Sequence, residues 1–278
     1  MFVNFFVIVI SEMSQTFSPY FTSKESQDDM KPIESSKLTS SFYNQDASSL
    51  AQSLLGKILV RQFESKERIC GRIVETEAYL GIKDKASHSF NHKQTFRTKP
   101  MFMKPGTIYI YSIYGMYHCM NISSRGDGAA VLLRAVEPLE GLDRMKSLRC
   151  QKQKTQHQRP FHQHQFCNGP SKICLSYGIH GKELNEMDIA SSSSTIWIED
   201  RNCQPQFETI SCARIGLGRK AEEWINAPLR FYVSGSTSVS ITDPIAQKLK
   251  SSTSWFNVID CHVKLISFGW KKIWLPNL

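Results

Sequence analysis

The sequence feature that most constrains the fold of this chain is the stretch over residues 101–124, MFMKPGTIYIYSIYGMYHCMNISS. Its aromatic and β-branched residues predict a strand over residues 107–111 and a returning strand over residues 116–122. The residues between them supply a turn, so the stretch predicts a β-hairpin with Tyr114 and Gly115 near its tip.

A large aromatic side chain at the tip of a hairpin is unusual, because a turn has no core in which to bury it. Two explanations are open for Tyr114. Its ring can pack back onto its own sheet, or it can stand out on the stiff two-stranded arm. A ring held out in this way can enter a groove of a DNA duplex and part a base step.

The charge of the chain indicates a polyanionic partner. The 278 residues include 34 Lys and Arg against 25 Asp and Glu, a formal net charge of +9. Such an excess favours nucleic acid or an acidic membrane surface. Residues 1–40 are slightly acidic and residues 144–182 contain no Asp or Glu, so the basicity belongs to the folded part.

The cysteines and the first residues bear on the compartment. The cysteines stand singly with no CxxC pair, which predicts reduced thiols in an intracellular protein: Cys70, Cys119, Cys150, Cys167, Cys174, Cys203, Cys212 and Cys261. Residues 1–10 are apolar but too short to span a bilayer. Because no basic residue precedes them, a signal peptide is disfavoured, although a targeting role stays open.

Composition and periodicity divide the chain into three parts. Residues 1–44 predict a flexible leader, residues 45–243 a folded domain, and residues 244–278 a tail without a recognisable pattern. Strands are expected over residues 57–63, 69–80, 107–111, 116–122, 129–136, 197–199 and 229–233. Helices are expected over residues 46–55, 139–149, 173–177 and 220–225.

Two of the expected strands carry charges that need an explanation. Alternation places Glu75, Glu77 and Tyr79 on one face of their strand, which is either a solvent face or a pocket wall. The residues alone favour the solvent face, because carboxylates are seldom buried. Arg134 interrupts an apolar strand, so it must find a partner or a cavity.

Several short motifs suggest sites of differing specificity. Residues 168–172, NGPSK, open an expected helix with a lysine beside free backbone N–H groups, which favours phosphate. The glycines of residues 214–219 lack dinucleotide-binding spacing. The Arg-Gly-Asp tripeptide of residues 125–127 fits an ordinary turn rather than a cell-adhesion site. The candidates for zinc fit no standard spacing: His157, His162, His164 and Cys167.

Four longer stretches resemble the alkyladenine DNA glycosylase family, also called 3-methyladenine DNA glycosylase. They are GRIVETEAYLG at residues 71–81, residues 101–141, NGPSKIC at residues 168–174, and RIGLGRKAEEW with the PLRFYVSGS that follows it. The resemblance covers residues 46–243. It implies a mixed α+β fold: a single domain with a curved, mainly antiparallel β-sheet flanked by helices and a protruding β-hairpin, and a basic face for DNA.

The resemblance also implies roles for individual residues. Glu77 corresponds to the general base that deprotonates water for attack on the sugar, and Arg134 would help to hold that water and the carboxylate. The aromatic walls of the pocket correspond to Tyr79, His88 and Tyr111. Asn121 and Leu132 would reject normal bases by crowding them.

The same resemblance predicts the contacts with DNA. Tyr114 would fill the space left by the flipped nucleotide, with Met116 and Tyr117 beside it. Contacts with the DNA backbone are expected from residues that are basic or lie at a turn: Arg125, Ser171, Lys172 and Arg219. No metal and no cofactor is implied.

The activity implied is that of a monofunctional glycosylase of base excision repair, which releases alkylated or deaminated purines and leaves an abasic site. Its partner would be duplex DNA with damaged purines. The protein would be a monomer in the nucleus, with no membrane association, and enzymes that act on abasic sites could follow it in the repair pathway. The alternative from the residues is a non-catalytic module whose sheet aromatics stack bases while Glu77 is merely solvated. The leader, the Gln- and His-rich residues 150–165, the tail and Arg125 depart from the family pattern.

Overall fold

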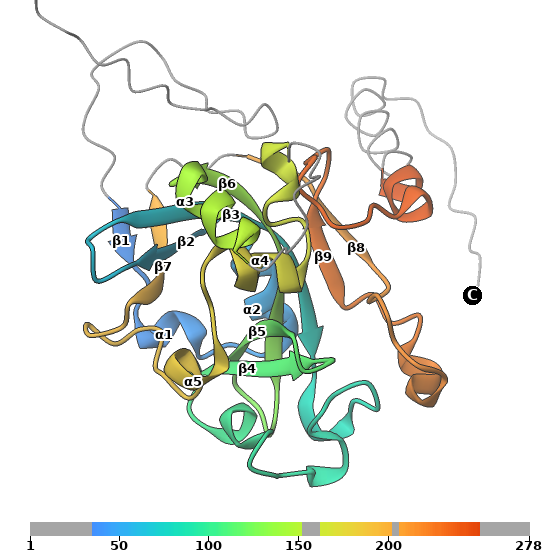
Figure 1. Cartoon of the computed structure of the whole chain (residues 1–278). Coiled ribbons are helices and arrows are strands. Elements are labelled where there is room, and N and C mark those ends of the chain that lie inside the picture. Colours follow the sequence, from blue (N-terminus) through green and yellow to red (C-terminus); the bar gives the residue numbers. More distant parts are fainter. Residues whose placement is uncertain (1–34, 152–161, 202–205, 251–278) are drawn as a thin grey trace, which may run out of the picture.

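The computed structural model describes residues 35–151, 162–201 and 206–250, which form one open sheet with helices against it (Figure 1). The sheet in this part of the chain has nine strands, and neighbouring strands are antiparallel. In chain order they are β1 (Ser35–Lys37), β2 (Ile58–Gln62), β3 (Arg68–Tyr79), β4 (Ile108–Ile113), β5 (Tyr117–Ser123), β6 (Ala130–Glu140), β7 (Ile196–Arg201), β8 (Thr209–Cys212) and β9 (Arg230–Val233). The predicted α+β class with a mainly antiparallel sheet is confirmed.

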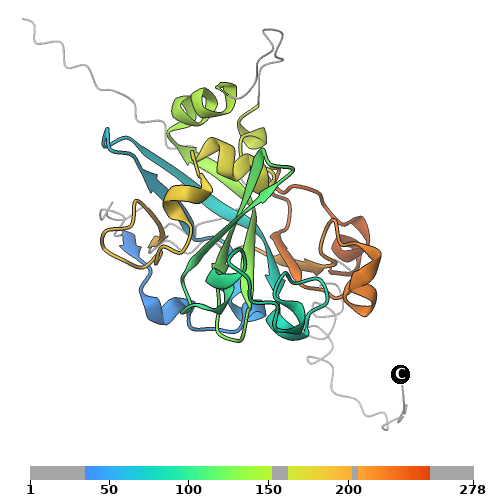
Figure 2. The same ribbon diagram turned by 60° about the horizontal axis from the view of Figure 1, so that its bottom comes forward.

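The order across the sheet is β1-β7-β2-β3-β6-β5-β4, and β9 joins at β3 and carries β8. Two views place β1 and β7 on one side of the molecule and the β8–β9 pair on the other (Figures 1 and 2). Strands β2 and β9 therefore lie one after the other along the same edge of β3, because β2 pairs with residues 68–72 and β9 with residues 75–77. Residues 75–77 thus have a strand on both sides.

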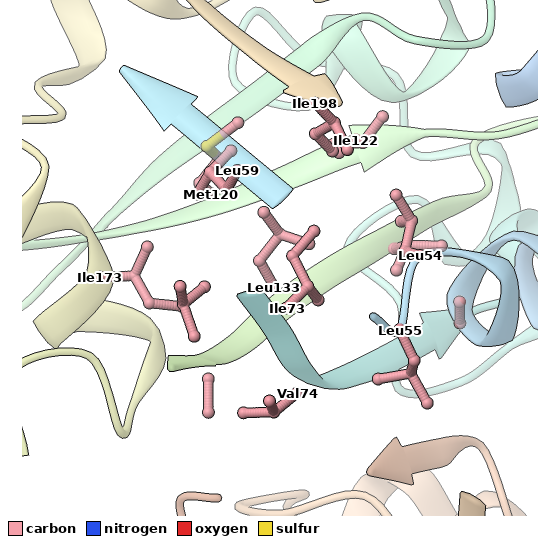
Figure 3. Packing of buried hydrophobic residues seen from close by; sticks show 14 of the residues in the cluster. Leu54, Leu55, Leu59, Ile73, Val74, Met120, Ile122, Leu133, Ile173 and Ile198 are labelled. Atoms are coloured by element: carbon pink, nitrogen blue, oxygen red, sulfur yellow. The ribbon is translucent and has the colours of Figure 1, made fainter. Parts of the chain in front are cut away.

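Helices cover the sheet. The labelled α-helices are α1 (Ser40–Tyr43), α2 (Ala47–Ser53), α3 (Leu142–Cys150), α4 (Pro170–Ser176) and α5 (Gly181–Leu184), and residues 244–250 are helical as well. Helix α2 packs on β3 and β6, and α4 packs on β5 and β6. Figure 3 shows apolar side chains from these elements meeting in one core, among them Leu54, Ile73, Leu133 and Ile173.

The start of α2 is set by its sequence. The Asp46 side chain caps the helix by accepting a hydrogen bond from the backbone N–H of Ser49 at 3.0 Å, which satisfies one of the free donors of the first turn. Leu50 and Leu54 follow at helical spacing and are fully buried. Gly56 then takes a positive φ of 83° where the chain turns into β2.

The boundary between β6 and α3 differs from the prediction. A helix was expected over residues 139–149, but β6 continues to Glu140 and α3 begins at Leu142. Pro138 lies within the strand, opposite a register shift at Gly71, a position where proline is tolerated. Gly141, with a φ of 74°, then makes the turn into the helix.

The expected leader is partly structured. Residues 35–37 form β1, which pairs with β7, and Tyr43 at the end of α1 is completely buried. Residues 35–44 therefore belong to the fold, because Leu38 and Tyr43 join the core. Residues 1–34 lie outside the described residues, and so does the tail beyond residue 250.

Smaller differences concern the short helices. Helix α4 begins at Pro170 rather than residue 173, and residues 219–224 form a 3₁₀-helix, η5 (Arg219–Trp224), in place of an α-helix. Six cysteines fall within the described part of the chain, and none of them is in a disulfide, as predicted: Cys70, Cys119, Cys150, Cys167, Cys174 and Cys212. No helix among the described residues has the length and apolar character needed to cross a membrane.

Candidate active site

The predicted hairpin is present as β4 and β5, and its tip carries apolar side chains into solvent. Tyr114 is 88% exposed, Met116 62% and Tyr117 40%. Tyr114 and Gly115 both have positive φ, 52° and 69°, so the turn holds the tyrosine in the left-handed region that non-glycine residues seldom adopt. The ring of Tyr114 does not pack back on its sheet, and the first of its two explanations is wrong.

The two acids on β3 are buried, so the predicted solvent face is also wrong. Glu75 and Glu77 are each 0% exposed. Alternation correctly predicted that the two acids share a face. It could not show that β9 pairs along this part of β3, or that the chain around Ile215 and Ser240 covers the acids. Because buried carboxylates need partners, each acid must be surrounded by donors.

The donors of Glu77 come from three elements. The Tyr79 hydroxyl donates to Oε2 at 2.9 Å. The backbone N–H of Ile215 donates to Oε1 at 2.7 Å, and Nη1 of Arg134 lies 3.2 Å from the same oxygen. Burial, followed by the charge of Glu77, raises the pKa of the Tyr79 hydroxyl well above its usual value, so this hydroxyl stays protonated and acts as a donor.

Glu75 lies behind Glu77 and shares Arg134 with it. Nε of Arg134 is 3.3 Å from Oε1 of Glu75, and Nη1 of Arg230 lies 2.8 Å from the same oxygen. The backbone N–H and the hydroxyl of Ser240 donate to Glu75 at 2.7 and 2.9 Å. Two carboxylates and two guanidinium groups thus form a buried cluster without net charge, and the predicted need of Arg134 for a partner is confirmed.

A β-bulge explains how Arg134 reaches both acids. Leu133 pairs with Thr76 and Ala135 with Glu75, so Arg134 is the extra residue of β6 at this register shift. Bulges of this kind re-aim a side chain and are over-represented beside active sites.

The register also aligns the residues expected to select the base. Glu77 pairs with Leu132, Leu132 with Asn121, and Asn121 with Tyr109, which makes a straight row across β3, β6, β5 and β4. Directly paired residues point to the same face of a sheet. The amide of Asn121 is fixed by a 3.1 Å hydrogen bond to the carbonyl oxygen of Tyr109.

The aromatic residues lie beside this row. The rings of His88 and Tyr111 meet edge to face with their centroids 4.7 Å apart, and Nδ1 of His88 lies 2.9 Å from the Tyr109 hydroxyl. Tyr111 interacts electrostatically with both Tyr79 and Glu77. The structure therefore gathers the three expected wall residues around the carboxylate.

His88 lies at the open side of this group. Its side chain is only partly covered, yet this desolvation, followed by the charges of Arg97 and Lys93, lowers its pKa to about 4. The imidazole is therefore neutral at physiological pH, with one nitrogen free to accept a hydrogen bond.

The four residues expected on the DNA backbone are not gathered in one place. Arg125 and Arg219 are exposed, Arg125 beside the carbonyl oxygen of Asn44 at 3.5 Å. Ser171 and Lys172 lie half-buried in α4, where the Lys172 ammonium donates to Oδ1 of Asn168 at 2.7 Å. Their contacts with phosphate stay a prediction.

Sequence reasoning missed three contributors to the site. The backbone of Ile215 binds Glu77, Arg214 stacks on Tyr79, and Asp84 pairs with Arg214. Residues 214–224 belong to a stretch that resembles the family, but nothing in that stretch alone singles out Arg214 or the backbone of Ile215. No group of three or more His, Cys, Asp and Glu side chains within the described ranges could hold a metal ion, and His157 of the zinc candidates lies outside them.

The arrangement can bind a flat ring next to a desolvated carboxylate that is held by neutral donors and one shared cation. This favours chemistry in which positive charge develops beside Glu77. It also argues against the alternative of a non-catalytic module, which required that Glu77 be merely solvated.

Comparison with known proteins agrees with this geometry. The sequence model of the family described as methylpurine-DNA glycosylase matches residues 41–237. The human DNA-3-methyladenine glycosylase is 48% identical over 208 residues, 74% of this chain and 69% of the relative. The mouse protein of the same name is 44% identical over 234 residues, 84% of this chain and 67% of the relative. A putative 3-methyladenine DNA glycosylase of Clostridium perfringens is 41% identical over 206 residues, 73% of this chain and 98% of the relative.

Proposed function

This chain belongs to the methylpurine-DNA glycosylase family, and we propose that Glu77 carries the chemistry of its active site. The protein is a DNA glycosylase of base excision repair, a hydrolase that acts on N-glycosyl bonds, and its partner is DNA. The observation that carries the proposal is the fully buried Glu77 carboxylate, which lies beside aromatic rings and is held by three donors.

Glu77 acts as a general base. It takes a proton from a water molecule whose oxygen forms a bond to the anomeric carbon of the deoxyribose, while the bond from that carbon to the base nitrogen breaks and its electrons leave with the base. The carboxylate also stabilises the oxocarbenium-like charge on the sugar. Arg134, between Glu77 and Glu75, holds the carboxylate in place.

The flipped base lies between Tyr79 on one side and the His88–Tyr111 pair on the other. Stacking of a base on an aromatic side chain contributes about 1–3 kcal/mol. Leu132 and Asn121, which follow Glu77 in the cross-strand row, crowd the exocyclic amino group of guanine and so reject normal bases. This pocket favours alkylated or deaminated purines.

The exposed tip of the hairpin supplies the wedge. A base inside a duplex is unreachable for chemistry at its glycosidic bond, so the nucleotide must rotate out of the stack. Tyr114 enters the space that the nucleotide leaves, and Met116 and Tyr117 contact the groove beside it. The exposure of these three side chains supports this role, because none of them is held by the core.

The remaining features follow from the same assignment. A carboxylate at the sugar cannot form the Schiff base that strand cleavage needs, so the enzyme is monofunctional and hands an abasic site to other repair enzymes. It acts on damaged duplex DNA as a monomer in the nucleus. A fluorescent fusion of the whole chain, compared with one lacking residues 1–10, tests this location and the targeting role of the apolar start.

The test of the function uses duplex oligonucleotides that each carry one modified purine, such as 7-methylguanine, hypoxanthine or ethenoadenine. After incubation with the full chain, half of each sample is treated with alkali. Strand breaks that occur only after alkali support a monofunctional glycosylase. Absence of breaks with every lesion contradicts the proposal, and breaks before alkali contradict its monofunctional character.

A further inference from the structure

A buried arginine lies behind one wall of the proposed pocket. The side chain of Arg214, between β8 and β9, is 0% exposed and forms a two-pronged ion pair with Asp84. Nη1 donates to Oδ2 at 2.6 Å and Nη2 to Oδ1 at 3.0 Å, and Nη1 also donates to the carbonyl oxygen of Ala78 at 2.9 Å. Asp84 is itself fixed by the backbone N–H groups of Leu80 and Ala86.

The guanidinium of Arg214 lies against the ring of Tyr79, with its central carbon 4.7 Å from the ring centroid. Two-pronged pairing uses the edge of a guanidinium, so its face is free to stack on an aromatic ring. Arg214 is fully buried whereas Tyr79 is partly exposed. The face of the tyrosine that Arg214 covers is therefore closed, and the opposite face is the one left for a base.

The next residue holds the proposed catalytic acid, since the backbone N–H of Ile215 donates to Oε1 of Glu77 at 2.7 Å. The anchoring of Arg214 thus fixes two parts of the site through one dipeptide. Building on the function proposed above, we propose that Arg214 is a positioning residue that holds Tyr79 and Glu77 and makes the pocket select neutral purine lesions over cationic ones.

The selection follows from the charge behind the ring. A cation is attracted to the negative face of an aromatic ring. Arg214 already occupies one face of Tyr79 and draws electron density toward itself, so a purine that carries a positive charge after ring-nitrogen alkylation gains less on the other face. A deaminated purine such as hypoxanthine has no net charge and loses nothing in this way.

The second wall has a similar arrangement. The guanidinium of Arg97 lies 5.4 Å from the ring centroid of Tyr111. Two cations beside the two proposed walls act in the same direction on a charged base. Arg97 is exposed and screened by water, however, so the larger effect is expected from the buried Arg214.

The experiment measures single-turnover base release from two duplexes, one with cationic 7-methylguanine and one with neutral hypoxanthine. The ratio of the two rates is compared between the wild type and the double variant Arg214→Gln, Asp84→Asn. The double variant removes both charges and keeps polar groups in their places. The ratio of the 7-methylguanine rate to the hypoxanthine rate is expected to rise about three- to tenfold. An unchanged or lower ratio overturns the proposal, because a purely structural role lowers both rates alike.

Two single variants keep the proposal falsifiable if the double variant does not fold. Asp84→Asn keeps the guanidinium and removes its counter-charge, so the ratio should lie at or below the wild-type value. Arg214→Lys keeps a cation and should leave the ratio within about twofold of the wild type. A clear rise in either variant overturns the proposal.

Different results contradict the proposed function and the proposed role of Arg214. If the wild type releases neither base, the proposed function is wrong. If it releases both bases and the double variant leaves the ratio unchanged, or a single variant raises it clearly, the function stands and only the role of Arg214 is wrong.

Discussion

Replacing Arg134 by methionine tests the buried charge cluster most severely. Methionine is unbranched and uncharged, so the change keeps an apolar stem and removes the guanidinium that lies 3.3 Å from Glu75 and 3.2 Å from Glu77. Glu75 keeps the cation of Arg230 at 2.8 Å and both donors of Ser240. Glu77 keeps only neutral donors, so the loss falls on Glu77.

Removing one partner of a buried ion pair destabilises a protein by about 3–5 kcal/mol. We therefore expect Arg134→Met to lower the free energy of unfolding at neutral pH by this amount and to reduce base release. Glu77→Gln alone leaves Arg134 paired with Glu75 and should lower it by only about 1–2 kcal/mol. The double variant removes the unpaired charge, so the sum of the two losses should exceed its measured loss by about 2 kcal/mol.

Urea denaturation of the four proteins measures these values, provided that the dependence of the free energy on urea concentration is the same in all of them. The matched control is Arg72→Met. Arg72 pairs with Glu137 at 3.1 Å between the same two strands, but both side chains are partly exposed, so its loss should be smaller and base release unchanged. Additive losses for Arg134→Met and Glu77→Gln would refute the assignment of the charge penalty to Glu77.

Three further changes test other parts of the account. Tyr114→Ala should change the free energy of unfolding by less than about 0.5 kcal/mol because the ring is exposed. It should weaken base flipping, followed with a fluorescent base analogue, more than it weakens DNA affinity, because that affinity depends mainly on phosphate contacts. Equal losses of flipping and affinity contradict the role of Tyr114 as a wedge. The pKa of His88 is lowered to about 4, so between pH 6.5 and pH 4 the unfolded state binds a proton that the folded state does not. The free energy of unfolding should therefore fall as the pH drops through this window. In urea titrations, His88→Gln should flatten this dependence of the free energy on pH. Gly81→Ala places a Cβ 2.1 Å from the carbonyl oxygen of Asp127, whereas the Cβ of Gly115→Ala meets nothing within 4 Å. Both positions have a positive φ, which costs either alanine about 1–2 kcal/mol. A thermal melt should therefore show a clearly larger loss of stability for Gly81→Ala, and equal losses contradict the close packing at Gly81.

Local sequence patterns predicted the strands around the hairpin and the shared face of Glu75 and Glu77, because alternation along a strand is a local property. They did not predict burial of these acids. That burial depends on β9, which is more than 150 residues further along the chain and pairs with residues 75–77. No local pattern contains a pairing of this kind.

The candidate site shows the same division. Arg134 was recognisable as a charge that needed a partner, but the bulge that aims it between two acids is visible only in the register of β6 on β3. The contribution of Ile215 is a backbone N–H, which every residue but proline has, so its sequence could not single it out. Arg214 was passed over for a related reason, since its role rests on the distant Asp84.

The measurement that tests the central claim most directly compares Glu77→Gln with the wild type on one hypoxanthine duplex, with enzyme in saturating excess. The amide keeps the size of the side chain and removes its ability to accept a proton from water. The account predicts that the single-turnover rate of base release collapses while the dissociation constant of the duplex stays within a few-fold of the wild type. An unchanged release rate, or a loss of binding as large as the loss of rate, would contradict the role of Glu77 as the base.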